Sequence, residues 1–579
     1  MRFQVLNTLV ALAGLSQYAV AAASEPTKPN ILFILTDDQD RHIDSLKHMP
    51  KLQKHLVQEG TEHVSHYCTI ALCCPSRVSL LRGQMAHNTN VTDVAPPYGG
   101  FPQFVANGLN DYYLPHFMAE AGYDTYYIGK IINSLTTSNY KDNFMKGWTD
   151  SEIFLDPFTY QYYNVSYSRN GAERETVVGT HSSNLIANHT SEWLTNILED
   201  QKQQKDNGED PTPFFFVAAP VSSHSEMDHS SGKEVVKMPQ YPDRYASYFT
   251  NVTIPRTPNF NPDEPSGASW VRDLQQLGEN TVDMLDEYYR ARLRSLQPVD
   301  EMIETLVNQL DRAGVLDNTY IVYSSDNGFH LGHHRCGAGK GLPYESDVNV
   351  PFIIRGPGIA KNQTNYHVSG HVDLAPTFLK LAGAKPKDFF DGKAMDIFND
   401  NGLSITSDTD DEFVQVEFWS DTIVENPFDS YYMGNNSYKA LRLVSPQYNL
   451  YYSVWCTGEH ELYDMSQDPY QMTNLLLEDG NRTLLGTTSE RVAQRLDGLL
   501  LVLKDCKSDA CRAPWSELHP DDSVNTLQDA LSSEHDDFYK QLPDVRYETC
   551  LEGYILSNEG PIFEQFKQDH QSLFSDTAT

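Results

Sequence analysis

Short apolar runs recur along the first two-thirds of the chain, and they show no helical stripe. The run at 30–36 is apolar at successive positions, which is the pattern of a strand buried on both faces of a parallel sheet. Similar runs lie at 214–218, 319–323 and 350–354. Helix-like segments such as 114–121 and 300–313 lie between them. This alternation predicts an α/β fold with helices on both faces of a large, mixed, mostly parallel sheet.

The pattern changes after about residue 390. Alternating apolar and polar positions at 413–419, 439–444 and 447–454 predict short antiparallel strands. The segment from 516 to the end is acidic and has little strand signal, so peripheral helices and coil are expected there. We therefore predict four regions, namely a signal peptide at 1–23, an α/β domain at 24–390, a small-sheet subdomain at 391–515 and an acidic extension at 516–579.

The N-terminus has the features of a secretory signal. Arg2 precedes an apolar run at 5–13, and small residues follow at 19–23. Ser16 and Gln17 interrupt the apolar character, and a membrane anchor needs roughly 20 continuous apolar residues. The sequence predicts a secreted or luminal protein without stable membrane insertion. Seven Asn-x-Ser/Thr sequons agree with this route and are candidate glycosylation sites: Asn90, Asn164, Asn188, Asn251, Asn362, Asn435 and Asn481.

The chain is strongly acidic, with 43 Lys and Arg against 79 Asp and Glu and a net charge of −36. Nucleic acid is not expected as a partner, because phosphate binding needs a basic surface. The same charge should repel long polyanions such as sulfated glycosaminoglycans. An equally good interpretation is that the charge serves solubility in an acidic or salty exterior.

Eight cysteines in 579 residues are too few for a fold built on disulfides. Cys506 and Cys511 flank a short acidic loop and are a plausible local pair. Apolar cores must therefore supply most of the stability.

Acidic and amide side chains follow two of the predicted strands. Asp37 and Asp38 come after the run at 30–36, and Asp326 and Asn327 come after the run at 319–323. Functional groups of open α/β sheets collect at the carboxyl ends of strands, and hard cations such as Ca²⁺ prefer oxygen ligands. Helix capping is the alternative role for each pair considered alone.

A compact motif at 73–77 reads Cys-Cys-Pro-Ser-Arg and precedes a short apolar helix pattern. On its own, Cys73 or Cys74 could be half of a disulfide. Together with the acidic strand ends, the motif resembles the sulfatases of the alkaline-phosphatase superfamily. Further elements that resemble the family are Gly129-Lys130, His224 after Ala219-Pro220, 289–292 with 299–300, Lys340 before Tyr344-Glu345 and Val350-Pro351, and 461–464 with 468–469 and 474–475. The resemblance covers roughly residues 28 to 476.

The resemblance implies an alkaline-phosphatase-like sandwich and a nucleophile made from Cys73. In the family this cysteine is oxidised to formylglycine by a formylglycine-generating enzyme, and the hydrated aldehyde attacks the sulfur of the ester. Conversion would leave seven cysteines, so at least one thiol would stay unpaired. The implied ligands of one divalent cation, Ca²⁺ with Mg²⁺ as the alternative, are Asp37, Asp38, the group at Cys73, Asp326 and Asn327. The implied catalytic and sulfate-binding residues are Arg77, Lys130, His224 and Lys340.

Two positions depart from the family pattern. Many sulfatases have a histidine two residues after the lysine, whereas this chain has Ile132 there and Asn133 next. The base that would release sulfate is therefore unassigned. The segment after the nucleophile is Leu-Arg-Gly-Gln at 81–84 in place of Leu-Thr-Gly-Arg. His330, His333 and His334 form a cluster that is expected in the substrate cleft or just behind it.

An aryl sulfate is the expected substrate, because the acidic surface disfavours polyanionic polymers. The segments 251–261 and 129–133 also resemble the glucosamine-6-sulfatase and arylsulfatase branch, so activity on sulfated amino sugars is an alternative. Choline sulfate remains open, as does phosphonate or phosphodiester hydrolysis on the same scaffold. A secreted binding glycoprotein is the non-enzymatic alternative, should Cys73 stay unmodified.

Overall fold

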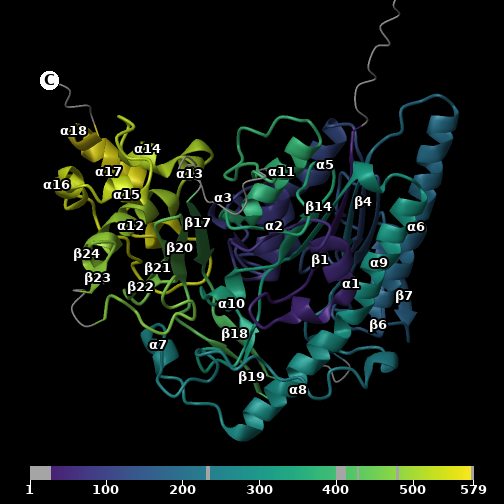
Figure 1. Ribbon diagram of the computed structural model, residues 1–579, viewed down its shortest axis with the longest axis horizontal. Coiled ribbons are helices and arrows are strands. Elements are labelled where there is room, and N and C mark those ends of the chain that lie inside the picture. Colours follow the sequence, from purple (N-terminus) through teal and green to yellow (C-terminus); the bar gives the residue numbers. More distant parts are fainter. Residues whose placement is uncertain (1–27, 230–234, 399–411, 427–428, 478–481, 575–579) are drawn as a thin grey trace, which may run out of the picture.

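A ten-stranded mixed sheet forms the centre of the computed structural model (Figure 1). The structure describes residues 28–229, 235–398, 412–426, 429–477 and 482–574, so the predicted signal peptide lies outside the described residues. In spatial order the strands are β15 (Gln363–Asn365), β2 (Thr61–His63), β14 (Phe352–Arg355), β11 (Thr319–Ser325), β1 (Asn30–Thr36), β8 (Phe214–Ala219), β4 (Asp124–Gly129), β5 (Asp150–Phe154), β6 (Asn164–Arg169) and β7 (Glu175–Val178).

The central strand β1 is buried on both faces, as its sequence predicts. Ile31, Phe33 and Leu35 belong to the core on one side of the sheet, and Leu32 and Ile34 belong to the core on the other. This division follows from the twofold alternation of side chains along a strand. Helices cover the two faces (Figure 1): α2 (Cys73–Arg82), α5 (Leu114–Glu120) and α11 (Leu374–Leu381) on the first, α6 (Ser182–Asp206) and α9 (Gln297–Arg312) on the second.

The predicted strands are present, but one runs in the opposite direction. β8 and β11 flank β1 in parallel, and β4 continues the parallel set beside β8. The run at 350–354 becomes β14, which pairs antiparallel with β11. The prediction of a parallel strand there was wrong, because an apolar run reports burial and carries no information on direction.

The two predicted helices are confirmed with small shifts at their ends. The segment 114–121 forms α5, and 300–313 forms α9, which begins at Gln297. The earlier start is compatible with Pro298, which lies in the first turn of the helix. Backbone N–H groups in the first turn have no partner within the helix, so the missing N–H of proline costs no hydrogen bond there.

The alternating segments near the C-terminus form a four-stranded antiparallel sheet, as expected. Its order is β17 (Phe413–Phe418), β20 (Tyr438–Val444), β21 (Asn449–Trp455) and β22 (His460–Asp464). Helix α12 (Ser489–Leu503) packs on one face of this sheet. Short helices follow it: α13 (Asp509–Arg512), α14 (Pro514–Leu518), α15 (Leu527–Ala530), α16 (Asp536–Tyr539), α17 (Phe563–Asp569) and α18 (Gln571–Phe574).

A second small sheet joins the two halves of the molecule. It contains β12 (His330–Leu331) and β13 (Ala338–Lys340) from the first half, and β18 (Thr422–Asn426) and β19 (Asp429–Met433) from the second. Because this sheet crosses the boundary predicted at 390, the domain limits stay predictions.

Two disulfides lie in the C-terminal part, Cys456–Cys550 and the predicted Cys506–Cys511 pair. Cys73 and three further cysteines are free and buried: Cys68, Cys74 and Cys336. The expectation of at least one unpaired thiol is therefore confirmed.

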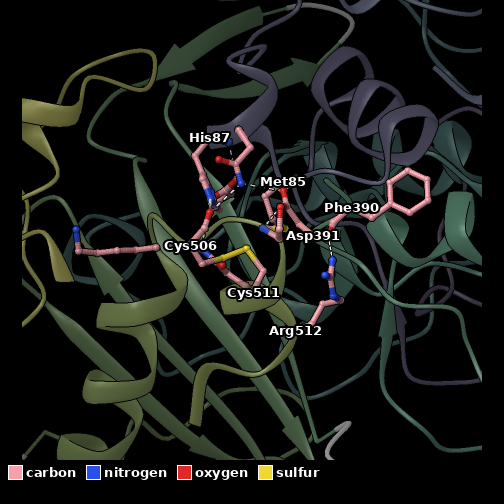
Figure 2. Close-up of a disulfide and its surroundings, with 12 residues drawn as sticks. Met85, His87, Phe390, Asp391, Cys506, Cys511 and Arg512 are labelled. Carbon is pink, nitrogen blue, oxygen red and sulfur yellow. Dashed lines mark hydrogen bonds and ion pairs between the residues drawn. A yellow bond between two sulfur atoms is a disulfide. The ribbon is translucent and has the colours of Figure 1, made fainter. Parts of the chain in front are cut away.

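The Cys506–Cys511 loop docks against the segment that follows α2 (Figure 2). His87 Nε2 lies 2.9 Å from the carbonyl oxygen of Cys506. Asp391 accepts hydrogen bonds from Ser508 N at 2.8 Å and from Met85 N at 2.7 Å, so one carboxylate connects the loop to the first half of the chain.

Within the described part of the chain, no helix is both long enough and apolar enough to cross a bilayer. Five predicted glycosylation sites are exposed: Asn90, Asn188, Asn251, Asn362 and Asn435. Asn164 is half-buried, and Asn481 lies outside the described residues.

Candidate active site

Four neighbouring strands, β11, β1, β8 and β4, end at one edge of the large sheet. Parallel strands bring their carboxyl ends together, which is where open α/β sheets build sites. The residues that follow these strands are Asp326 and Asn327 after β11, Asp37 and Asp38 after β1, His224 after β8 and Lys130 after β4. Helix α2 and strand β13 add Cys73, Arg77 and Lys340. The structure thus brings the predicted catalytic and metal-binding residues together.

Cys73 is the first residue of α2 and is 2 % exposed. Its Sγ lies 3.4 Å from Asp37 Oδ1 and 3.7 Å from Asp38 Oδ1. Burial raises the pKa of the thiol well above its usual range, and the charge of Asp326 adds to the effect. The unmodified thiol is therefore a poor nucleophile in this place.

Arg77 lies one turn further along α2 and points to the same site. Its Nε donates to Asp326 Oδ2 at 2.8 Å, and its Nη1 donates to the carbonyl oxygen of Lys130 at 2.6 Å. The guanidinium is 1 % exposed and connects the ends of β11 and β4. A buried arginine with these partners is fixed in position.

Two buried lysines flank Cys73 and pair with different aspartates. Lys130 Nζ donates to Asp37 Oδ2 at 2.6 Å. Lys340 Nζ donates to Asp38 Oδ1 at 2.5 Å and lies 3.0 Å from Cys73 Sγ. Burial alone would lower the pKa of each ammonium, but the adjacent carboxylates outweigh it and raise both values. Both lysines are therefore cations across the physiological range.

The three aspartates differ in their electrostatic environment. Burial and the charge of Asp326 raise the pKa of Asp37. Burial alone would also raise the pKa of Asp38, but the adjacent Lys340 and His224 outweigh burial and lower this pKa. Burial is likewise overcome at Asp326, where Arg77 and the two lysines hold the pKa far below its usual range.

His224 faces this cluster from the loop after β8. Its Nε2 lies 3.5 Å from Asp38 Oδ2, and its Nδ1 is 2.8 Å from the carbonyl oxygen of Ser225. With Nδ1 as the donor to that carbonyl, Nε2 is the nitrogen that faces the site.

Tyr160 supports His224 and Lys130 at once. Its ring centroid lies 4.3 Å from that of His224 and 4.7 Å from Lys130 Nζ. Its hydroxyl accepts a hydrogen bond from Asn133 Nδ2 at 2.6 Å. Sequence reasoning missed this residue, because a single tyrosine in a loop, among 33 in the chain, gives no signal.

The acidic cluster fits a hard divalent cation. Asp38 Oδ2 and Asn327 Oδ1 are buried and make no hydrogen bond. Ligand atoms of Asp37, Asp38, Cys73 and His224 all lie within 4.8 Å of one another. Asp326 is adjacent, since its Oδ1 accepts from Asp38 N at 3.0 Å. Unpartnered buried carboxylate and amide oxygens are the donor set that Ca²⁺ or Mg²⁺ would satisfy.

A pocket of about 560 Å³ opens over Cys73. Lys340 and His224, which are 2 % and 3 % exposed, lie at its buried inner end, and Asn133 and Tyr160 also line it. Its outer wall includes Met227, Val235, Ile423, Tyr431 and Tyr432. Two carboxylates, Asp156 and Glu425, also line it.

The predicted histidine cluster does not line this pocket. His330 Nδ1 pairs with Asp347 at 2.9 Å, and His334 Nδ1 lies 2.8 Å from Ser266 Oγ. All three histidines, His333 included, are buried. Their contacts serve the packing of the loop around β12.

Several known proteins similar to this chain are sulfatases. The sulfatase family profile matches residues 29–384, and the profile of the N-sulphoglucosamine sulphohydrolase C-terminal region matches residues 337–497. The arylsulfatase of Volvox carteri is 36% identical, over 96% of this chain and 86% of its own length. Human N-acetylglucosamine-6-sulfatase is 30% identical, over 87% of this chain and 90% of its own.

A solved structure supports the fold. A protein in complex with its substrate D-glucosamine-2-N,6-O-disulfate superimposes with a TM-score of 0.60 at 22% identity, covering 78% of this chain and 94% of that one. The family profile spans more than half of the chain, and the relatives extend over nearly all of it. The chain therefore belongs to the sulfatase family of sulfuric ester hydrolases.

Proposed function

We propose that this protein is a secreted arylsulfatase that cleaves an aryl sulfate to a phenol and inorganic sulfate, with formylglycine at position 73 as the nucleophile. The division of the pocket carries the proposal. Cations surround Cys73 at the inner end, and apolar and aromatic side chains form most of the outer wall. A sulfate group fits the first surface and an aromatic ring fits the second.

Charge in the pocket argues against anionic sugar polymers. Among the described residues, Lys340 is the only lysine or arginine that lines it, and Lys340 belongs to the sulfate end. Asp156 and Glu425 add negative charge, as does the net charge of −36 for the whole chain. A polyanionic leaving group would meet repulsion in both places.

Two further groups would complete the site, namely a divalent cation and the formylglycine made from Cys73. A divalent cation held by Asp37, Asp38, Asp326 and Asn327 would supply Lewis acidity at the nucleophile and at a sulfate oxygen. Formylglycine would supply, once hydrated, one hydroxyl that attacks sulfur and a second whose deprotonation allows sulfate to leave.

The polar side chains of the site have separable roles. Lys130 and Lys340 bind sulfate oxygens and stabilise the charge that develops on them. Arg77 holds the strand ends in register through Asp326 and the Lys130 carbonyl. With protons on both ring nitrogens, His224 keeps its Nδ1–H on the Ser225 carbonyl and donates the Nε2 proton to the departing phenolic oxygen. Asn133 Oδ1 has no hydrogen-bond partner, so it is an acceptor for substrate, and an amide is not a base.

Hydrolysis of N-acetylglucosamine 6-sulfate is the second candidate. Human N-acetylglucosamine-6-sulfatase aligns over 87% of this chain, and the two pocket carboxylates are suitable acceptors for sugar hydroxyls. Turnover of 4-nitrophenyl sulfate and of this sugar sulfate, measured on one preparation, separates the two. 4-Nitrophenyl phenylphosphonate, a phosphonate monoester, tests hydrolysis of phosphonate esters in the same assay.

Mass spectrometry of the tryptic peptide that ends at Arg77 tests the nucleophile. Protein secreted by its own host should carry an aldehyde in place of the Cys73 thiol. The C73S variant should release at most one phenol per active site and show no sustained turnover, because an ordinary serine lacks the second hydroxyl that expels sulfate. An intact Cys73 thiol in active protein, or sustained turnover by C73S, contradicts the proposal.

Secretion is supported by features outside the site. The N-terminus carries a signal-like pattern, and the two disulfides are typical of an oxidising compartment. Five sequons are exposed to modification. N-terminal sequencing of protein from the culture medium should find a start near residue 22 or 24.

A further inference from the structure

One wall of the pocket is a face of the small sheet that joins the two halves of the molecule. Ile423 on β18 stands opposite Lys340 on β13 and opposite Tyr432 on β19. Directly opposed residues of antiparallel strands point to the same face, and so does the residue two positions along. Glu425 therefore shares this face, and all four residues line the pocket.

Glu425 is a buried carboxylate without a paired cation. It is 1 % exposed, and its Oε2 accepts a hydrogen bond from Ser225 Oγ, which also contacts the hydroxyl of Tyr288. Among the described residues it forms no ion pair with lysine or arginine. The charge of Glu425 also acts on Lys340, but that ammonium pairs with Asp38 at 2.5 Å. Glu425 therefore has no cation of its own in the described part of the chain, and the salt bridges of the fold do not account for this residue.

Sulfate binding does not account for it either. A carboxylate repels an anionic sulfate group, and the cations that bind sulfate lie around Cys73. Glu425 is two positions from Ile423 along β18, in the direction away from the end of β13 that carries Lys340. Glu425 therefore lines the pocket at a point separate from the sulfate end.

We propose that Glu425 selects the leaving group, favouring phenols with a cationic or hydrogen-bond-donating substituent and disfavouring phenols with an anionic one. The inference rests on the proposed arylsulfatase function and specifies its substrate class. Tyr431 and Tyr432, which are 40 % and 69 % exposed on the outer wall, add aromatic faces that suit a cationic substituent.

Asp156 provides a matched control. It lines the same pocket, but its Oδ2 accepts a hydrogen bond from the backbone N–H of Ser134 at 2.7 Å. Its carboxylate is thus already used to hold the loop that contains Asn133. A general effect of negative charge in the pocket would involve both acids, whereas the proposal assigns the selection to Glu425.

The test uses three aryl sulfates that differ only in a remote charge, namely 4-(aminomethyl)phenyl, 4-(hydroxymethyl)phenyl and 4-(carboxymethyl)phenyl sulfate. The methylene group keeps the phenols close in acidity. For the wild-type enzyme, kcat/KM for the aminomethyl substrate should exceed that for the carboxymethyl substrate by about tenfold or more. E425Q should reduce this ratio by about tenfold, mainly through KM, while D156N should change it less than about threefold.

Each outcome has a definite meaning. An unchanged ratio in E425Q, or an equal loss in D156N, overturns the role of Glu425 and leaves the arylsulfatase proposal intact. If wild-type enzyme that carries the aldehyde hydrolyses none of the three substrates, the proposed function itself is overturned. Should E425Q not fold, as judged by its melting temperature, the neutral variant E425M replaces it, and a ratio in E425M equal to that of the wild type overturns the inference.

Discussion

At the scale of single residues, Tyr160 positions two functional side chains with one ring. Its ring lies 4.3 Å from the ring of His224 and 4.7 Å from Lys130 Nζ. We expect Y160L to lower kcat/KM for aryl sulfates about tenfold, because the cation–π contact and the support for the imidazole are lost. Y160F, which keeps the ring and loses only the hydrogen bond from Asn133, should stay within about threefold of wild type.

The leaving group gives this prediction its control. If Tyr160 acts through His224, the loss in Y160L is larger for phenyl sulfate than for 4-nitrophenyl sulfate, since the poorer leaving group depends more on proton donation. Equal losses on both substrates together with a lower melting temperature would show a purely structural role.

Sequence alone could predict the residues whose signal is local. Asp37 and Asp326 follow apolar strands, and Cys73 with Arg77 lies in a five-residue motif. Tyr160 and Glu425 could not be found this way, because they reach the pocket only through packing between distant segments. Glu425 is in the site because β18 pairs with β13, more than eighty residues earlier in the chain.

At the scale of elements, the Cys506–Cys511 loop fastens the C-terminal part to the segment after α2 (Figure 2). We expect the double variant C506S/C511S to lose about 2 kcal/mol of unfolding free energy, from the chain entropy that a loop of about six residues no longer removes. Urea denaturation measures this loss.

The variant D391N tests the docking separately from the disulfide. The substitution replaces the charged carboxylate that accepts hydrogen bonds from Ser508 N and Met85 N with a neutral amide. We expect it to lower the free energy of unfolding by about 1–3 kcal/mol. If the loop and the carboxylate act as one clamp, the two losses combine to less than their sum. Strict additivity would show that the disulfide stabilises only its own loop.

The elements show the same limit of prediction as the residues. Apolar runs located β1, β8 and β11 because a doubly buried strand has a distinct composition. The direction of β14 was missed, since it depends on the route of the chain between β11 and β14 through the loops around β12 and β13.

At the scale of the whole molecule, buried neutral histidines make stability depend on pH. His181 is 1 % exposed, and burial lowers its pKa from 6.5 to about 4. Between these values the unfolded chain binds a proton that the folded protein does not. The free energy of unfolding therefore falls as pH decreases from 6.5 to 4, by up to about 1.4 kcal/mol per pH unit for this residue.

The variant H181N should flatten that dependence. Asparagine keeps an acceptor for Ser183 N, which His181 Nδ1 meets at 3.3 Å, and does not titrate. We expect lower stability at pH 7 but a slope between pH 6 and 4.5 that is smaller by about 1 kcal/mol per pH unit. H570N, at an exposed histidine, is the control and should keep the wild-type slope. Equal slopes for all three proteins would contradict the prediction.

The small sheet that joins the two halves has an evolutionary consequence. The residues that we propose to bind sulfate all come from the chain up to Lys340, whereas the hairpin of β18 and β19 supplies part of the wall that we propose to meet the leaving group. Bond breaking and choice of alcohol are thus encoded in separate stretches of the gene. Replacement of this one hairpin during evolution could change which sulfate esters the enzyme accepts, while the residues that carry out the reaction stay the same.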